Sequence, residues 1–362
     1  MANSKIYKQP WLHSPIIDGV FILSPPFIAL LLVNVLPSQF QTASAIPVYY
    51  WLFLIVFVDV AHVYSTLFRT YLAGGTYVKD PFLIVVPIAC YVVGVLLYSF
   101  DGLLFWRVLA YLAIYHFIRQ QYGFMRLYGR EERYNTWFRL IDNLAIYTAT
   151  IYPLYYWHFE SKRNFNWFVD NDVISFHSPF LLKIGLCLYL LIILFYLVKE
   201  CIYVSRVKRF NLPRNLLIGG TFLSWYFGIV YFNGDLAFTT LNVVSHGIPY
   251  MALVWIFEKN KQTNSSHKKH LLREYIFSRY GGVIVFVSVL AFLAYVEEGL
   301  WDGMIWKEHG SVFSIFSGMP KISNAQILAL LVPLLALPQS THYVLDGFIW
   351  KIRKPNRSKT KV

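Results

Sequence analysis

The sequence predicts an all-α integral membrane protein that forms one domain over residues 1–362 and crosses the bilayer with about ten helices. Of the 362 residues, 57% are hydrophobic and 14% are charged, whereas about a quarter of an average soluble domain is charged. The hydrophobic residues form runs of about 20, the length that a helix needs to cross a bilayer. A soluble enzyme and a disordered chain are therefore excluded.

The apolar runs follow one another with mostly short connections and without an internal repeat. We expect spans at 16–36, 46–68, 81–100, 103–124, 138–157, 179–199, 213–232, 236–257, 281–301 and 325–350. The first run contains Pro25-Pro26 and lacks a small-x-small cleavage site, so we interpret it as a span and not as a signal peptide. The three cysteines lie in or beside apolar runs without CxxC spacing, which indicates neither a disulfide framework nor a thiolate metal site.

The basic residues between the runs predict the orientation. The segments on one side of the predicted membrane hold 25 Lys and Arg and those on the other side hold 4. Because cytoplasmic loops are enriched in Lys and Arg, both termini, the polar loop 258–280 and the basic tail 351–362 are predicted to be cytoplasmic. The sequon at Asn264 would then face the wrong side for glycosylation. The net charge of +13 comes from these cytoplasmic segments, so we expect no nucleic-acid partner. We expect the protein to lie in a bacterial plasma membrane.

Eight polar residues inside the predicted spans are candidate functional residues, because ionisable groups in a bilayer are costly. They are Asp59, His62, His116, Arg119, Gln120, His246, His342 and Asp346. At a rise of about 1.5 Å per residue, the four histidines lie roughly 10, 15, 18 and 13 Å from the cytoplasmic ends of their helices. Four imidazoles from four helices therefore share one layer in the cytoplasmic leaflet.

The spacing within each helix suggests metal chemistry. Asp59 precedes His62 by three residues, Gln120 follows His116 by four, and Asp346 follows His342 by four, so each pair shares a helix face. Imidazole and carboxylate are ligands of non-haem iron, manganese and zinc, and a carboxylate can also orient a liganding imidazole. We expect the four histidines to be ligands, with Asp59 and Asp346 as ligands or orienting partners. Alternatively, each aspartate has a structural role only and forms an ion pair with Arg119 or Arg69.

Two prolines lie beside candidate ligands. Pro249 follows His246 by three residues and frees the carbonyl of Ser245, and Pro338 precedes His342 and frees the carbonyl of Leu334. Such carbonyls need partners at membrane depth. An ordinary proline kink explains both equally well.

This layer of His62, His116, His246 and His342, with Asp59 and Asp346, resembles the polyhistidine membrane metalloenzymes. That class includes lipid desaturases and hydroxylases and the Brp/Blh-type carotene dioxygenases. The resemblance implies a metal-dependent oxidoreductase or oxygenase that uses one or two non-haem iron ions on a membrane lipid or isoprenoid from the cytoplasmic leaflet, with an electron donor as a further partner. Arg119 and Gln120 would then be catalytic and bind a polar head group or a reduced oxygen species.

Three other functions fit the same residues. A zinc-dependent lipid hydrolase, similar to the ceramidase and adiponectin-receptor type, would use the histidines to hold Zn²⁺ and activate a water. Paired histidines could ligate haem b in an electron carrier. An ion- or proton-coupled transporter would use the polar layer as a relay, although no repeat supports it.

Overall fold

The structure is a computed structural model that describes residues 8–73, 80–132, 135–160, 163–263, 275–277 and 281–350. All regular structure in these ranges is helical, as the sequence predicts. The sequon at Asn264, most of the loop 258–280 and the tail 351–362 lie outside them, so the orientation remains a prediction.

The described helices are α1 (Pro15–Asp18), η1 (Gly19–Leu23), α2 (Pro25–Val35), α3 (Gln39–Thr42), α4 (Val48–Trp51), η2 (Leu52–Val60), α5 (Ala61–Arg69), α6 (Phe82–Phe100), α7 (Gly102–Tyr128), α8 (Thr136–Phe159), α9 (Pro179–Val207), α10 (Leu212–Trp225), η4 (Tyr226–Tyr231), α11 (Asp235–Thr263), α13 (Gly282–Trp301), η5 (Asp302–Trp306), η6 (Ser314–Phe316), α14 (Ala325–Leu335) and α15 (Leu337–Ile349).

All ten expected spans are helical, but they differ in polarity. Five helices are long and apolar enough to cross a membrane: Val48–Arg69, Phe82–Phe100, Pro179–Val207, Asp235–Lys261 and Gly282–Trp306. Two bent pairs, α1–η1 with α2 and α14 with α15, raise the number to seven. The other three expected spans form α7, α8 and α10–η4 and are more polar than these. The ten-span count therefore stays a prediction, while a membrane protein is supported.

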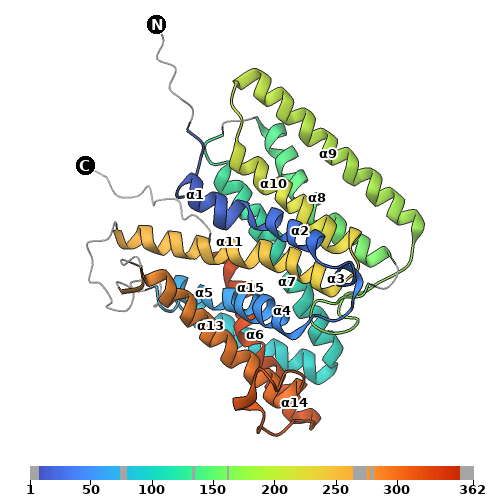
Figure 1. Ribbon diagram of the computed structural model, residues 1–362, viewed down its shortest axis with the longest axis vertical. Coiled ribbons are helices and arrows are strands. Elements are labelled where there is room, and N and C mark those ends of the chain that lie inside the picture. Colours follow the sequence, from blue (N-terminus) through green and yellow to red (C-terminus); the bar gives the residue numbers. More distant parts are fainter. Residues whose placement is uncertain are drawn as a thin grey trace.

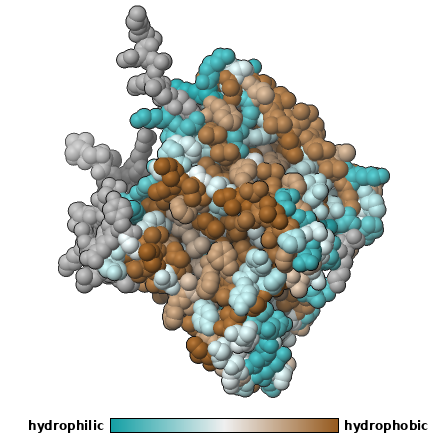
Figure 2. Space-filling model, viewed as in Figure 1, coloured by the Kyte–Doolittle hydropathy of each residue, from teal (hydrophilic) through white to brown (hydrophobic). Residues whose placement is uncertain are grey.

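The outer surface has the apolar character that a lipid environment requires. Large apolar side chains are exposed along α6 and α9, including Ile84 and Leu96 at 64% and Phe180 at 71%. Figure 2 shows apolar side chains over much of the middle of one face, with hydrophilic ones concentrated toward its rim. Exposed apolar area of this extent indicates contact with lipid or with another protein.

Helix α11 runs through the middle of the bundle (Figure 1). On one side it contacts α2, η1 and α10, and on the other it contacts η2 and α5. Tyr250 and Val254 pack with Val56, Phe286 and other buried residues in one core, while Leu253 and Ile256 pack with residues of α7, α8 and α10 in another. The helix thereby positions His246 between the two halves.

Two local features bring α11 and the helix of His62 together. The segment η2 is π-helical and leads directly into α5, which begins one residue before His62. Such widened turns occur frequently at functional sites. A Cβ atom on Gly247 would lie 2.9 Å from the Val58 carbonyl oxygen, so only glycine permits this close approach of α11 to η2. The residue beside His246 is therefore fixed by packing.

The polar helices α8 and α10 share a buried network of charges with α9. Lys199 Nζ lies 2.5 Å from both Asp142 Oδ1 and Glu200 Oε1. Arg214 pairs with Asp142 at 2.8 Å and with Glu200 at 2.5 Å, and also with Glu132 at 3.2 Å. Sequence reasoning missed this network, because its members belong to four separate segments and have no common spacing.

We expect Lys199→Met to destabilise the fold by about 3–5 kcal/mol, because it leaves Asp142 and Glu200 buried with less compensating charge. Thermal unfolding in a neutral detergent measures the loss. Arg206→Met is the matched control, since Arg206 lies on the same helix and is exposed. Equal stability of the two variants would contradict a structural role for the network.

Candidate metal centre

The structure brings His62, His116, His246 and His342 together in the interior. They come from α5, α7, α11 and α15, and each is at most 2% exposed. One ring nitrogen from each lies within 4.8 Å of the others. This confirms that the four histidines converge. His246 is among them, although no carboxylate lies within one helical turn of it in the sequence.

Their Nε2 atoms are joined by three short contacts, in the order His62, His246, His116 and His342. The separations are 3.2 Å from His62 to His246, 3.1 Å from His246 to His116 and 3.1 Å from His116 to His342. A square with sides of this length has its centre about 2.2 Å from each corner, close to the metal–imidazole distance of about 2.0–2.1 Å. A single metal ion therefore fits between the four nitrogens.

The ring positions distinguish a square from a tetrahedron. A metal-bound imidazole has its ring centroid about 3.2 Å from the ion, so a square predicts about 4.6 Å between adjacent rings and about 6.4 Å between opposite rings, while a tetrahedron predicts about 5.3 Å throughout. Adjacent rings lie 4.4, 4.7, 4.9 and 5.0 Å apart. The opposite rings of His62 and His116 lie 6.4 Å apart with an interplanar angle of 15°. The array is therefore close to square.

A chain of hydrogen bonds connects the outer nitrogen of His342 with Asp346, which lies beside the outer nitrogen of His116. His342 Nδ1 lies 2.6 Å from Thr66 Oγ1, which lies 3.1 Å from the Tyr250 hydroxyl. The Tyr250 hydroxyl donates to Asp346 Oδ1 at 2.6 Å. The second oxygen of Asp346 lies 3.4 Å from His116 Nδ1. Because the carboxylate only accepts, this order of bonds places a proton on His342 Nδ1 and turns its Nε2 lone pair inward, and the carboxylate beside His116 Nδ1 favours a proton there as well.

Asp59 is a charged neighbour of His62: its Oδ1 lies 3.6 Å from His62 Nδ1, which is beyond hydrogen-bond distance, and this Nδ1 has no hydrogen-bond partner among the described residues. Asp59 and Asp346 lie on the Nδ1 side of the imidazole rings, away from the Nε2 array. Asp346 is on the same helix as His342, yet its Oδ2 lies 3.4 Å from His116 Nδ1 on α7. Of the two roles expected for these carboxylates, ligand or orienting partner, this placement fits the second.

His246 is held differently. Its ring stacks on Phe117 with 3.5 Å between centroids and an interplanar angle of 5°. Its Nδ1 has no hydrogen-bond partner among the described residues. Stacking therefore orients this ring, whereas the Nδ1 atom of His342 has a hydroxyl partner and that of His116 lies beside a carboxylate.

Gln120 supports the backbone of α11 and does not contact the Nε2 array. Its side-chain amide donates to the carbonyl of His246 at 2.9 Å. Gln121 lies 3.4 Å from the carbonyl of Ser245, the group that Pro249 leaves without its helical donor. These two amides therefore satisfy carbonyls around the ligand turn. The break between α14 and α15, bent by 43°, likewise falls at Pro338.

The structure does not bring Arg119 to the histidines. Arg119 is exposed, donates to the Tyr147 hydroxyl at 2.5 Å and lies over the ring of Tyr122. Arg69 pairs with Glu258 at 3.1 Å and lies over the Phe257 ring. Among the described residues neither arginine forms an ion pair with Asp59 or Asp346. The alternative of purely structural aspartate–arginine pairs is therefore not observed.

Thr66 and Tyr250 were missed as site residues, although the sequence contains a signal for both. Each of the four histidines is followed four positions later by a polar residue: Thr66, Gln120, Tyr250 and Asp346. Residues four apart share a helix face. Applying this rule to all four helices, and not only to those with charged or amide side chains, identifies the hydrogen-bond chain.

No protein-family model, curated protein or solved structure matches this chain in comparison. The assignment of function therefore depends on the geometry of the site.

We expect Asp346→Asn and Asp59→Asn to lower metal affinity about 10–100-fold while the protein stays folded, because each removes the charge that orients a histidine. Metal content after dialysis against a graded chelator, together with thermal unfolding, measures both properties. Asp101→Asn is the control, since Asp101 is an exposed helix cap and Asn caps equally well. Full metal retention with a large loss of stability would contradict the orienting role.

We expect Thr66→Val, which keeps the shape of the side chain, to weaken metal binding as well. It removes the acceptor of His342 Nδ1, and a buried donor without an acceptor costs about 1–3 kcal/mol. Chelator competition measures the loss. Thr70→Val is the matched control at the C-cap of the same helix, because the Thr70 hydroxyl donates to the Thr66 backbone carbonyl. An equal effect of both substitutions would count against the hydrogen-bond chain.

Proposed function

We propose that this protein is a membrane-embedded, metal-dependent oxidoreductase that holds one non-haem iron ion between His62, His116, His246 and His342. The observation that carries the proposal is the near-square arrangement of the four histidines, whose Nε2 atoms approach to 3.1–3.2 Å at three contacts. Lone pairs at 3.1–3.2 Å repel one another unless protons or a cation lie between them. In a buried site a metal ion offsets this cost for all four at once.

The array favours iron over the alternative cofactors. Zinc is almost always tetrahedral in four-coordinate protein sites, whereas the ring distances fit a square. Imidazole ligands suit iron, copper, nickel and zinc, so the choice of iron among them is the part of the proposal that elemental analysis tests directly. Haem b is disfavoured, because the four imidazoles occupy the plane that a porphyrin would need.

An apolar groove supports a lipid or isoprenoid substrate. This groove, of about 280 Å³, lies between α5, α6, α14 and α15. Its walls are mostly apolar, with Leu67, Pro87 and Leu334 among them, and it reaches Thr66 and His342. A hydrocarbon chain in the groove would approach the metal centre from the apolar outside of the bundle. Bound iron would supply the one-electron chemistry that oxidation of such a chain requires.

The chain's own residues would hold and orient the centre. Thr66, Tyr250 and Asp346 keep protons on the outer nitrogens of His342 and His116. Burial of all four rings excludes bulk water, which strengthens electrostatic interactions at the site. Gln120 and Gln121 hold the turn of α11 that carries His246.

We expect about one iron per chain in protein purified in a neutral detergent, and loss of most of it in His62→Ala, His116→Ala, His246→Ala and His342→Ala. Elemental analysis measures the content. His158→Ala is the control, because His158 is half-buried and bonds to the Tyr111 hydroxyl at 3.0 Å, outside the array.

The activity is tested by comparing membrane lipid extracts from cells that express the native chain or His116→Ala. The proposal expects lipids with added oxygen or lost hydrogen only with the native chain. Bound zinc without iron, accompanied by hydrolysed lipid, would instead favour the hydrolase. A haem spectrum or the absence of any bound metal would also overturn the proposal.

A further inference from the structure

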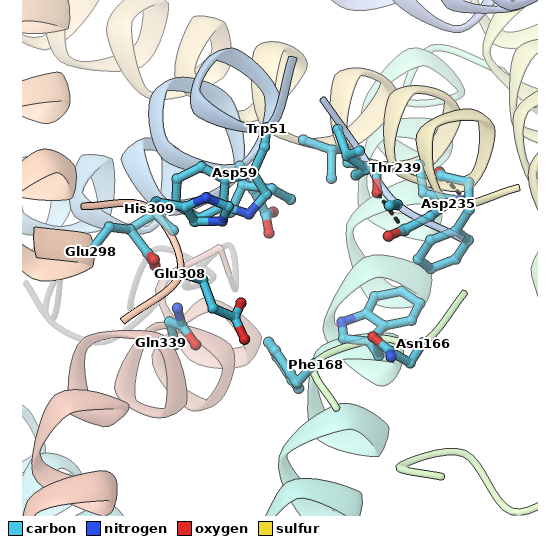
Figure 3. A pocket seen from close by; sticks show the side chains of 18 of the residues that line it. Trp51, Asp59, Asn166, Phe168, Asp235, Thr239, Glu298, Glu308, His309 and Gln339 are labelled. Carbon is cyan, nitrogen blue, oxygen red and sulfur yellow. Dashed lines mark hydrogen bonds between the residues drawn. The ribbon is translucent and has the colours of Figure 1, made fainter. Parts of the chain in front are cut away.

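Two neighbouring cavities lie outside the histidine array. Figure 3 shows a cavity of about 420 Å³ between the start of α4–η2, the start of α11, the end of α13 and the loop after η5. A neighbouring cavity of about 480 Å³ shares Trp51, Phe168, Glu298 and Glu308 with it, among other residues. We name the two together the acidic chamber.

The charge of the chamber is opposite to that of the chain. The carboxylates of Asp59, Asp235, Glu298 and Glu308 line the first cavity, and Asp170 lines the second. No Lys or Arg is among the described residues that line either one, although the chain carries a net charge of +13. The electrostatic field of such a cavity concentrates cations.

Glu298 points to a ligand independently of this charge count. Its side chain is only 9% exposed, and it forms no hydrogen bond or ion pair with any described residue. In Figure 3 its carboxylate faces the chamber. A buried carboxylate without a partner is costly, and a cation in the chamber would offset that cost.

The chamber fits an organic cation better than a bare metal ion. Among the described residues the four histidines are the only group of three or more potential ligands close enough to share one ion, so the chamber carboxylates do not form a preorganised metal site. Aromatic rings line the walls between the carboxylates, including Trp51, Phe117 and Phe168. Aromatic faces combined with negative charge are the surroundings in which proteins bind quaternary ammonium groups.

We propose that the acidic chamber binds an organic ammonium group, carried either by a small free amine or by the head group of a cationic lipid. Asp59 lines the chamber and faces His62 Nδ1, and Phe117 lines it and stacks on His246. The bound group therefore lies beside the metal centre. The proposal does not depend on the identity of the metal, because Glu298, Asp235 and Glu308 are outside the array.

The test compares choline with its neutral isostere 3,3-dimethylbutan-1-ol by isothermal titration calorimetry on the full chain in a neutral detergent. We expect choline to bind and the isostere to bind at least about tenfold more weakly, because only the cation is attracted by the carboxylates and the aromatic faces. Glu298→Gln should weaken choline binding by a similar factor. Glu131→Gln, an exposed carboxylate in a loop, is the control and should change nothing.

Asp235→Asn is a second variant in case Glu298→Gln fails to fold, because Asn can still accept the bond from Thr239. Metal content measured on the same samples separates this proposal from the proposed function, since both variants should keep their metal. Dodecyltrimethylammonium identifies the source of the group: much tighter binding than choline indicates a lipid head group, and equal binding indicates a free amine. Equal binding of choline and its isostere, or unchanged binding in both variants, would overturn the proposal.

Discussion

The convergence of four imidazole lone pairs on one point is the constraint on which the rest of the interior depends. Three Nε2–Nε2 contacts of 3.1–3.2 Å join histidines that are up to 226 residues apart in sequence. Without a cation, protons would have to be placed on alternate nitrogens, but the hydroxyl beside His342 Nδ1 and the carboxylate beside His116 Nδ1 favour the tautomer that leaves Nε2 without a proton. By favouring protons on Nδ1, these polar groups leave the Nε2 lone pairs of His342 and His116 available to a cation.

The layer of histidines could be predicted from sequence, because depth along a helix follows from residue counting. The partners could not, since a spacing of three or four residues identifies a shared face but not which neighbouring helix that face meets. Asp346 illustrates this point: it is one turn from His342, yet its carboxylate faces His116 on α7. Arg119 illustrates the opposite error, because it directly precedes Gln120 and lies on a different face of the same helix, where it contacts Tyr147.

The spans could be located from apolar runs, but their environments could not. Helices α6 and α9 are mostly exposed and α11 is mostly buried, although all three are long and apolar enough to cross a membrane. Buried polar residues make α7, α8 and α10 less apolar, and these are helices whose side chains contact one another or the site: Gln121 reaches Ser245, and Arg214 reaches Asp142. Polarity within a span thus reports interior packing, which depends on pairings between distant segments that no local pattern contains.

Two surfaces of different polarity, the apolar groove and the acidic chamber, lie next to the histidine array. The apolar groove reaches His342 and Thr66 from between α5, α6, α14 and α15, and the acidic chamber reaches Asp59, behind His62, from the opposite ends of η2 and α11. Desolvation keeps charged groups out of the groove, while the carboxylates of the chamber favour cations and disfavour anions. A reactant that has both an apolar chain and a cationic group would therefore be oriented by the protein before any chemistry occurs, whereas a purely apolar reactant would use the groove alone. The separation of these two surfaces around one centre follows from where Asp59 and Thr66 stand on the same helical segment, on either side of His62.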